Sequence, residues 1–195
     1  ILLEGTGSGA GSSNTGVFTA TATLTTAGLG TITIKGTAGT GGLNTTYNQG
    51  VRLATTTATT ADGAIDVEGT GNAAGTGTYA TGVQLLTSIL QTSGLGAGSS
   101  ISVDGTAGAG TSYNEGIQIS TTSKALTVGG TITLQGTGAG SGSANRGLNI
   151  SSSTVESSAG GAVTLRGTAS ATSTGTTNDG ISLTGSRAAT GGVLT

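Results

Sequence analysis

The chain has 195 residues and a formal net charge of −2, and it contains no proline, cysteine, methionine, tryptophan or histidine. Without cysteine there is no disulfide framework or thiolate nucleophile, and without histidine the usual metal ligand and general base are missing. Six basic residues give no footprint for nucleic acid, and no apolar run is long enough for a membrane-spanning helix. Three tyrosines and one phenylalanine predict no stacking platform for bases or sugar rings.

Large aliphatic residues are few, but they recur on a register, which is typical of a repeat protein and not of a disordered chain. The first signature has two aliphatic residues one position apart, then a residue that is usually charged, then Gly-Thr. Its glycines are spaced by 31, 33, 36, 31 and 31 residues. The six copies are Ile1–Thr6, Ile32–Thr37, Ile65–Thr70, Ile101–Thr106, Ile132–Thr137 and Val163–Thr168.

A second signature follows each copy, with its glycine 11 to 14 residues after the first glycine. It reads Asn or a small residue, any residue, Gly, aliphatic, any residue, aliphatic. It begins at Asn14, Asn48, Ala80, Asn114, Asn145 and Asn178. A weaker apolar position beyond it holds Leu24, Leu90 and Val155, with alanine in the other copies.

Both signatures alternate with period 2, which predicts strands and not helices. Valine, isoleucine and threonine dominate them and suit a pleated surface. We expect the glycine-rich stretches between the strands to supply turns with positive φ. Each repeat therefore contains two clear strands and one weaker strand.

One repeat cannot bury its few aliphatic side chains, but stacked repeats can, because like strands then pair in parallel about 4.8 Å apart. The sequence therefore predicts an all-β fold, a parallel β-solenoid that forms one domain over residues 1–195. We expect right-handed crossovers, which dominate parallel β connections. The predicted solenoid has about six coils of 31–36 residues, beginning near Ile1, Ile32, Ile65, Ile101, Ile132 and Val163.

The ends of the predicted solenoid carry no recognisable cap. A strand begins at Ile1, and Thr195 stands where another strand is due. Reading Gly191–Thr195 into Ile1–Thr6 gives a junction similar to the internal segment Gly130–Thr137. We therefore expect uncapped ends that pair head-to-tail along the axis, with another copy or with further repeats of a longer chain.

The strands "ITIKGT", "ITLQGT" and "VTLRGT", with their Asn-x-Gly-aliphatic partners, resemble a known repeat type. They are similar to the repeat regions of giant bacterial surface proteins, the filamentous-haemagglutinin-like and autotransporter-like β-helical adhesins and fibres. The resemblance covers the whole chain. It implies an extracellular or cell-surface location and a structural or adhesive role. It carries across no catalytic residue and no cofactor, so we expect no enzyme activity.

Two sets of polar residues are candidate sites. The outward column Glu4, Lys35, Glu68, Asp104, Gln135 and Arg166 contains the acidic residues Glu68 and Asp104, beside which Asp66 and Ser102 lie. Asp66, Glu68 and Asp104 are a weak calcium candidate, and the plainer interpretation is a solvated acidic patch. The recurrent asparagines are either ligand amides or, as we expect, a structural ladder that hydrogen-bonds coil to coil.

The sequence favours a structural protein whose stacked coils build an extracellular or cell-surface filament. The main alternative is the rigid stalk of an adhesin that presents a binding tip. An ice-binding surface is a remote alternative, because Asp66 interrupts the outward threonine pairs such as Thr31/Thr33 and Thr131/Thr133. A polysaccharide-active enzyme is a second remote alternative. The turns consist of glycine, serine and threonine and offer no aromatic-lined groove for a sugar chain.

Overall fold

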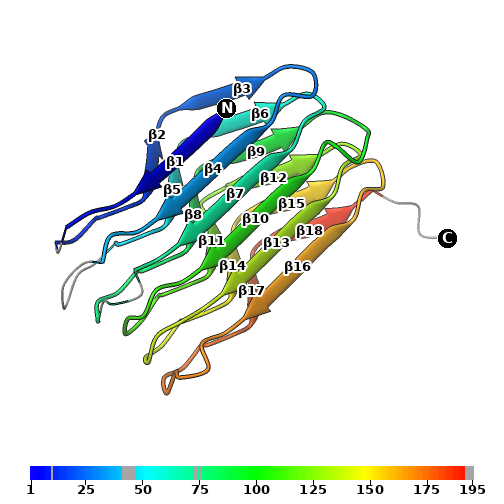
Figure 1. The fold of residues 1–195 in the computed structure, drawn as a ribbon. Coiled ribbons are helices and arrows are strands. Elements are labelled where there is room, and N and C mark those ends of the chain that lie inside the picture. Colours follow the sequence, from blue (N-terminus) through cyan, green and yellow to red (C-terminus); the bar gives the residue numbers. More distant parts are fainter. Residues whose placement is uncertain (10, 41–46, 73, 75, 192–195) are drawn as a thin grey trace.

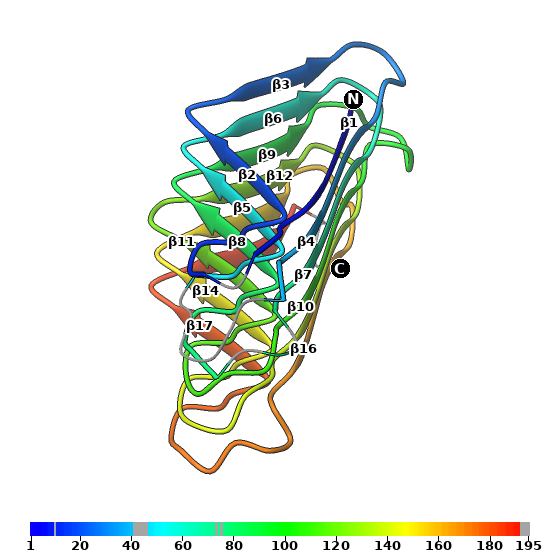
Figure 2. The ribbon, with the colours of Figure 1, turned by 60° about the vertical axis from the view of Figure 1, so that its left-hand side comes forward.

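A computed structural model describes residues 1–9, 11–40, 47–72, 74 and 76–191 of the chain. These residues form an all-β structure with no helix, in which three parallel sheets wind around a shared interior as a β-solenoid (Figures 1 and 2). Each sheet has six strands, so about five turns of the chain separate the first strand of a sheet from its last, and the prediction was about six coils. The predicted fold class is therefore confirmed.

Each coil contributes one strand to each sheet, and sequence order is kept along every sheet. The first sheet contains β1 (Leu2–Thr6), β4 (Ile32–Thr37), β7 (Ile65–Thr70), β10 (Ile101–Thr106), β13 (Ile132–Thr137) and β16 (Val163–Thr168). The second contains β2 (Val17–Ala20), β5 (Val51–Ala54), β8 (Val83–Leu86), β11 (Ile117–Ser120), β14 (Leu148–Ser151) and β17 (Ile181–Thr184). The third contains β3 (Thr23–Thr26), β6 (Thr57–Thr60), β9 (Ile89–Thr92), β12 (Lys124–Thr127), β15 (Thr154–Ser157) and β18 (Arg187–Thr190).

The core is built from aliphatic columns that run along the axis. Ile101 pairs in register with Ile65 on one side and with Ile132 on the other, and all three are fully buried. The second sheet places Val83 and Ile117 in another buried column, as expected from the second signature. The weaker apolar position forms the third column, which contains Leu24, Ala58, Leu90, Ala125, Val155 and Ala188.

The signature glycines allow two backbones to touch. A Cβ on Gly69 would lie 2.2 Å from the carbonyl oxygen of Gly82, and a Cβ on Gly82 would lie 2.4 Å from the nitrogen of Thr106. Neither glycine has a positive φ. The signature glycines are instead required by the close packing of the first sheet on the second. The expected positive-φ glycines lie between the strands, at Gly9, Gly28, Gly140, Gly160 and Gly185. Threonine, serine or tyrosine takes positive φ at many of the corners, including Thr55, Thr87 and Tyr79.

The recurrent asparagines form the predicted structural ladder. The Asn114 Oδ1 accepts the backbone N–H of Ala80 at 2.9 Å, and the Asn114 N–H donates to Asn145 Oδ1 at 3.1 Å. The Asn145 N–H donates in turn to Asn178 Oδ1 at 2.9 Å. Each amide oxygen thus accepts a hydrogen bond from the main chain of the preceding coil, which ties neighbouring coils together.

A second polar ladder lies between the second and third sheets. The N–H of Thr56 donates to Ser88 Oγ at 3.0 Å, the N–H of Ser88 donates to Ser123 Oγ at 3.0 Å, and Ser153 donates likewise to Ser186. Ser88 and Ser123 are fully buried. Sequence reasoning missed this ladder because serine and threonine are so frequent in the chain that a column of them carries no signal.

Both ends of the described structure expose sheet edges. Strands β1, β2 and β3 lie at the edges of the three sheets at one end, and β16, β17 and β18 lie at the other. Large apolar side chains are exposed at both, including Leu2 at 64% and Leu183 at 44%. Within the described ranges no helix covers either end, but the predicted junction through residues 192–195 lies outside them.

Candidate functional sites: the outer charged column and the open ends

The charged column lies on the outer face of the first sheet. Lys35 Nζ lies 3.2 Å from Glu68 Oε2, and both side chains are at least half exposed. Among the described residues Lys35 pairs with Glu68 and forms no ion pair with Glu4. An exposed pair of this kind contributes at most about 1 kcal/mol, so the column affects stability little.

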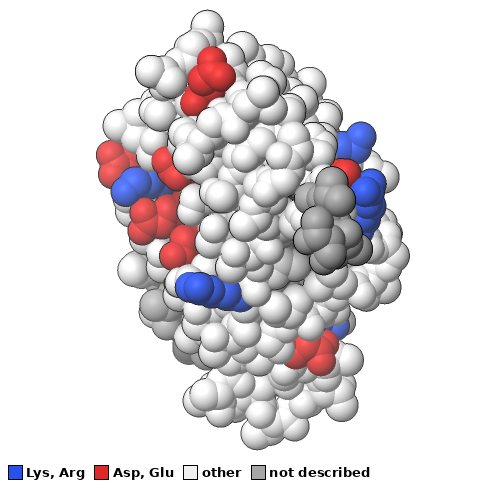
Figure 3. Space-filling model, turned by 90° about the vertical axis from the view of Figure 1, so that its right-hand side faces the viewer, with Lys and Arg blue, Asp and Glu red and all other residues white. Residues whose placement is uncertain are grey.

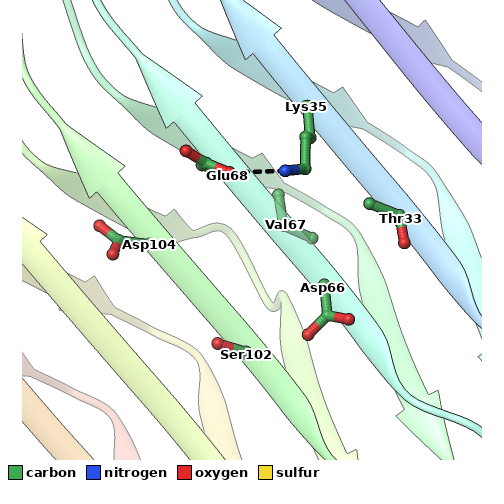
Figure 4. Close-up of a pocket in the computed structure, with 7 residues that line it drawn as sticks. All are labelled: Thr33, Lys35, Asp66, Val67, Glu68, Ser102 and Asp104. Atoms are coloured by element: carbon green, nitrogen blue, oxygen red, sulfur yellow. Dashed lines mark ion pairs between the residues drawn. The ribbon is translucent and has the colours of Figure 1, made fainter.

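The predicted acidic patch lines a shallow hollow on this face (Figure 4). In Figure 4 Glu68 reaches toward Lys35, whereas Asp66 lies beside Ser102, further along the strands. The three carboxylates therefore share a surface without converging on one point. Within the part of the chain that the structure describes, no group of three acidic side chains is arranged to hold a metal ion. The residues lining the hollow are Thr33, Lys35, Asp66, Val67, Glu68, Ser102 and Asp104.

The carboxylates that line the hollow interact electrostatically with one another. Partial burial raises the pKa of Asp104, and the negative charge of Glu68 raises it further. Figure 3 shows a mostly uncharged face on which acidic and basic side chains lie side by side in a group at the left edge. Nothing here resembles the dense oxygen cage that calcium prefers.

The same sheet face also bears on the ice-binding alternative. Thr33, Asp66 and Ser102 occupy equivalent positions on adjacent strands, followed by Thr133 and Thr164. Asp66 therefore interrupts a row of hydroxyl groups, and the Lys35–Glu68 pair stands beside the interruption. A flat, uncharged array is not formed on this face.

The edge strands at the two ends of the described structure form the second candidate site. An edge strand presents unpaired N–H and C=O groups, which are a template for pairing with another strand. At one end Ile1 and Leu2 are exposed by 45% and 64%, and Phe18 of β2 is exposed by 57%. At the other end Ile181 and Leu183 are exposed by 40% and 44%. Each end thus combines backbone edges with uncovered apolar side chains.

The structure also assembles a tyrosine ladder that sequence reasoning missed. The rings of Tyr47 and Tyr79, and those of Tyr79 and Tyr113, are stacked with centroids 5.0 Å apart and interplanar angles of 9° and 11°. All three tyrosines of the chain therefore stack in one column. A signal was present, since each tyrosine directly precedes a copy of the second signature.

Glu115 is the most deeply buried of the described acidic residues, and its position went unremarked in the sequence. Its Oε1 accepts hydrogen bonds from Arg146 Nη1 at 2.9 Å and Asn149 Nδ2 at 2.8 Å, while its Oε2 has no partner in the described structure. Burial raises the pKa of Glu115, and the contacts with Arg146 and Asn149 only partly oppose that effect. Arg146 also pairs with Asp179 at 3.3 Å.

The fold defines the described part of the chain as a parallel β-solenoid. Comparison with known proteins adds no family: no family model matches the chain, and neither a curated protein nor a solved structure does. The described residues include no helix with the length and apolar character needed to cross a membrane.

Proposed function

We propose that the protein is a structural β-solenoid of the cell surface or extracellular space whose coils continue end to end as a filament. The observation that carries the proposal is the open edge of all three sheets at both ends, with exposed apolar side chains beside it. Docking β16, β17 and β18 onto β1, β2 and β3 of the next unit would extend each sheet. It would also cover Leu2 and Leu183.

The charges at the two ends favour this head-to-tail arrangement of successive units. The outward column of the first sheet ends with Glu4 on β1 and Arg166 on β16, and both side chains are exposed. A head-to-tail junction in register places Arg166 of one unit beside Glu4 of the next, as Lys35 now lies beside Glu68. Opposite charges at facing positions of paired strands are favourable, and like charges are unfavourable.

The resemblance to the repeat regions of bacterial surface proteins supports the same proposal and its location. A largely uncharged surface of serine, threonine and glycine, without cysteine, methionine or tryptophan, offers few targets for oxidation outside the cell. The filament acts mechanically: backbone ladders run along its axis, and dry aliphatic columns hold the coils in register.

A charge-swap experiment tests the proposal. Sedimentation velocity and electron microscopy of the purified chain are expected to show concentration-dependent filaments with an axial repeat of about 4.8 Å. Glu4→Arg and Arg166→Glu should each weaken assembly, and the double variant should restore it. Thr133→Arg, on the same face but away from the ends, is the control. A chain that stays monomeric at high concentration would refute the filament.

A further inference from the structure

A mixed aromatic and polar surface covers the outer side of the second sheet and the segments that lead into it. We call it the tyrosine–amide face. Its outer layer consists of the tyrosine ladder and a half-buried row of long polar side chains aligned from strand to strand. Beneath that layer lies a row of buried polar residues, Gln49, Thr81 and Glu115. The row of long polar side chains is Arg52, Gln84, Gln118 and Asn149.

The tyrosine ladder has two accessible end rings. Tyr47 and Tyr113 are exposed by 44% and 46%. The equivalent positions in the coils beyond them hold Ser13 and Ala144, which share the positive φ of the tyrosines. Neither residue has a ring that could continue the stack, so the ladder ends in tyrosine faces open to a planar or ring-shaped ligand.

The polar rows contain hydrogen-bonding capacity that the protein does not use. Of the five buried side-chain polar atoms that lack a partner in the described structure, four lie here: Gln49 Oε1, Arg52 Nε, Thr81 Oγ1 and Glu115 Oε2. Buried polar groups are normally satisfied, so a cluster of unsatisfied atoms calls for a ligand or ordered water. Three of the four are oxygen acceptors, and Arg52 Nε is a donor, so a hydroxyl group can serve either kind.

The ring ladder and the polar rows belong to one surface. Glu115 accepts a hydrogen bond from Asn149 of the half-buried polar row, and Gln84 is hydrogen-bonded to both Gln49 and Gln118. The pKa of Tyr79 is raised by burial, by the neighbouring tyrosines and by the Glu115 carboxylate. Glu115 of the buried row therefore interacts electrostatically with the tyrosine ladder.

The charged groups of the tyrosine–amide face balance in number, with Arg146 and Arg52 against Glu115 and Asp179. Arg146 bridges Glu115 and Asp179 at 2.9 and 3.3 Å, and the Arg52 guanidinium lies 5.4 Å above the ring of Phe18. What is left for a ligand is a set of amide groups, hydroxyl groups and aromatic rings. That set complements an uncharged molecule rich in hydroxyl groups and is poorly matched to a phosphate or sulfate polymer.

We propose that the tyrosine–amide face binds an uncharged glycan. The coil repeat of about 4.8 Å is close to the length of one sugar residue in an extended glycan, so successive sugars meet equivalent side chains. Sugar hydroxyls bond to the amide row, and a sugar ring packs on an exposed end tyrosine. The proposal is independent of the filament, because this face runs along the side of the solenoid.

Intrinsic fluorescence gives a direct readout of binding. The chain has no tryptophan and all three tyrosines lie in the ladder, so tyrosine emission reports on this face alone. The probes are β-1,4-linked hexasaccharides of glucose, mannose and N-acetylglucosamine, with hexagalacturonate as the charged counterpart. We expect at least one neutral hexasaccharide to change the emission saturably, with calorimetry giving the same affinity.

Matched variants then locate the site. Gln118→Ala and Tyr113→Ala should each lower the affinity about tenfold, a change of about 1.4 kcal/mol. Tyr113→Phe should retain most of it. Alanine already occupies the ladder position at Ala144, so the backbone accepts the truncation. Gln135→Ala, an exposed glutamine on the first sheet, is the control and should bind as the unaltered chain does. Circular dichroism verifies folding.

Three results would overturn the proposal. One is that no neutral hexasaccharide binds at millimolar concentration. Another is that only hexagalacturonate binds. The third is that binding survives both Gln118→Ala and Tyr113→Ala in folded protein, which would place the ligand elsewhere. Loss of filament formation in any variant does not affect this test, since binding is measured below the assembly concentration.

Discussion

At the scale of single residues, the inward and outward alternation of the strands decides which substitutions the solenoid tolerates. Ile101 is fully buried between Ile65 and Ile132, whereas Thr133, one position beyond Ile132, is on the outer face. The two positions are neighbours in space and belong to the same sheet. They therefore give a matched test of the register.

Ile101→Asp is expected to destabilise the protein by about 4 kcal/mol or more, because it removes a packed side chain and buries an unpaired carboxylate. Thr133→Asp should change stability by about 0.5 kcal/mol or less, as surface substitutions usually do. Chemical denaturation of both variants measures the difference. Equal losses would mean that the alternation is shifted by one residue.

The signature glycines are a second constraint at this scale. Gly69→Ala is expected to cost about 1–3 kcal/mol, because its Cβ would lie 2.2 Å from the Gly82 carbonyl oxygen and the two sheets would have to separate. Gly96→Ala is the control, since a Cβ there meets nothing within 4 Å. It should be neutral or stabilise by up to about 1 kcal/mol. Comparable melting temperatures for the two variants would contradict the close-packing explanation.

At the scale of elements, alternation of apolar residues was enough to predict two strands of every coil and their pairing. The third strand was weaker because alanine replaces a large aliphatic residue at Ala58, Ala125 and Ala188. The tyrosine ladder and the buried serine ladder were not predicted. The tyrosine column could have been found, because each tyrosine directly precedes a copy of the second signature. The serine column is hidden by the abundance of serine and threonine in the chain.

The Glu115 network joins β11 and β14 and makes stability depend on pH. Because burial raises the pKa of Glu115, the folded state binds its proton more tightly than the unfolded state. The contribution of Glu115 to the free energy of unfolding is fully present below the ordinary glutamate pKa. It is lost as the pH rises through the raised pKa of the folded state. Acidification should therefore raise the melting temperature relative to Glu115→Gln, which cannot titrate.

The comparison isolates Glu115 because Asp104, whose pKa is also raised, is present in both proteins. Arg146, Asn149 and Gln118, which face the carboxyl group, are likewise unchanged between the two proteins. Parallel pH profiles of the unaltered protein and Glu115→Gln, measured by thermal unfolding, would contradict the prediction.

At the scale of the whole molecule, each strand pairs only with strands of the adjacent coils, so stability spreads through nearest neighbours. Hydrogen exchange of the monomer should be slowest in β7 and β10, at the centre, and fastest in the edge strands β1 and β16. In filaments, β1 should gain protection because its edge is paired. Uniform protection in the monomer would contradict this description.

The shared register of all coils makes the length of the molecule adjustable. Ile32, Ile65 and Ile101 begin equivalent strands, so removing residues 65–100 would bring β4 directly onto β10 with every column continuous. Recombination between similar repeats in the gene can add or remove such a unit, and the strands that then become neighbours pair as the existing ones do. Each event changes the reach of the solenoid in steps of about 4.8 Å and leaves its cross-section unaltered.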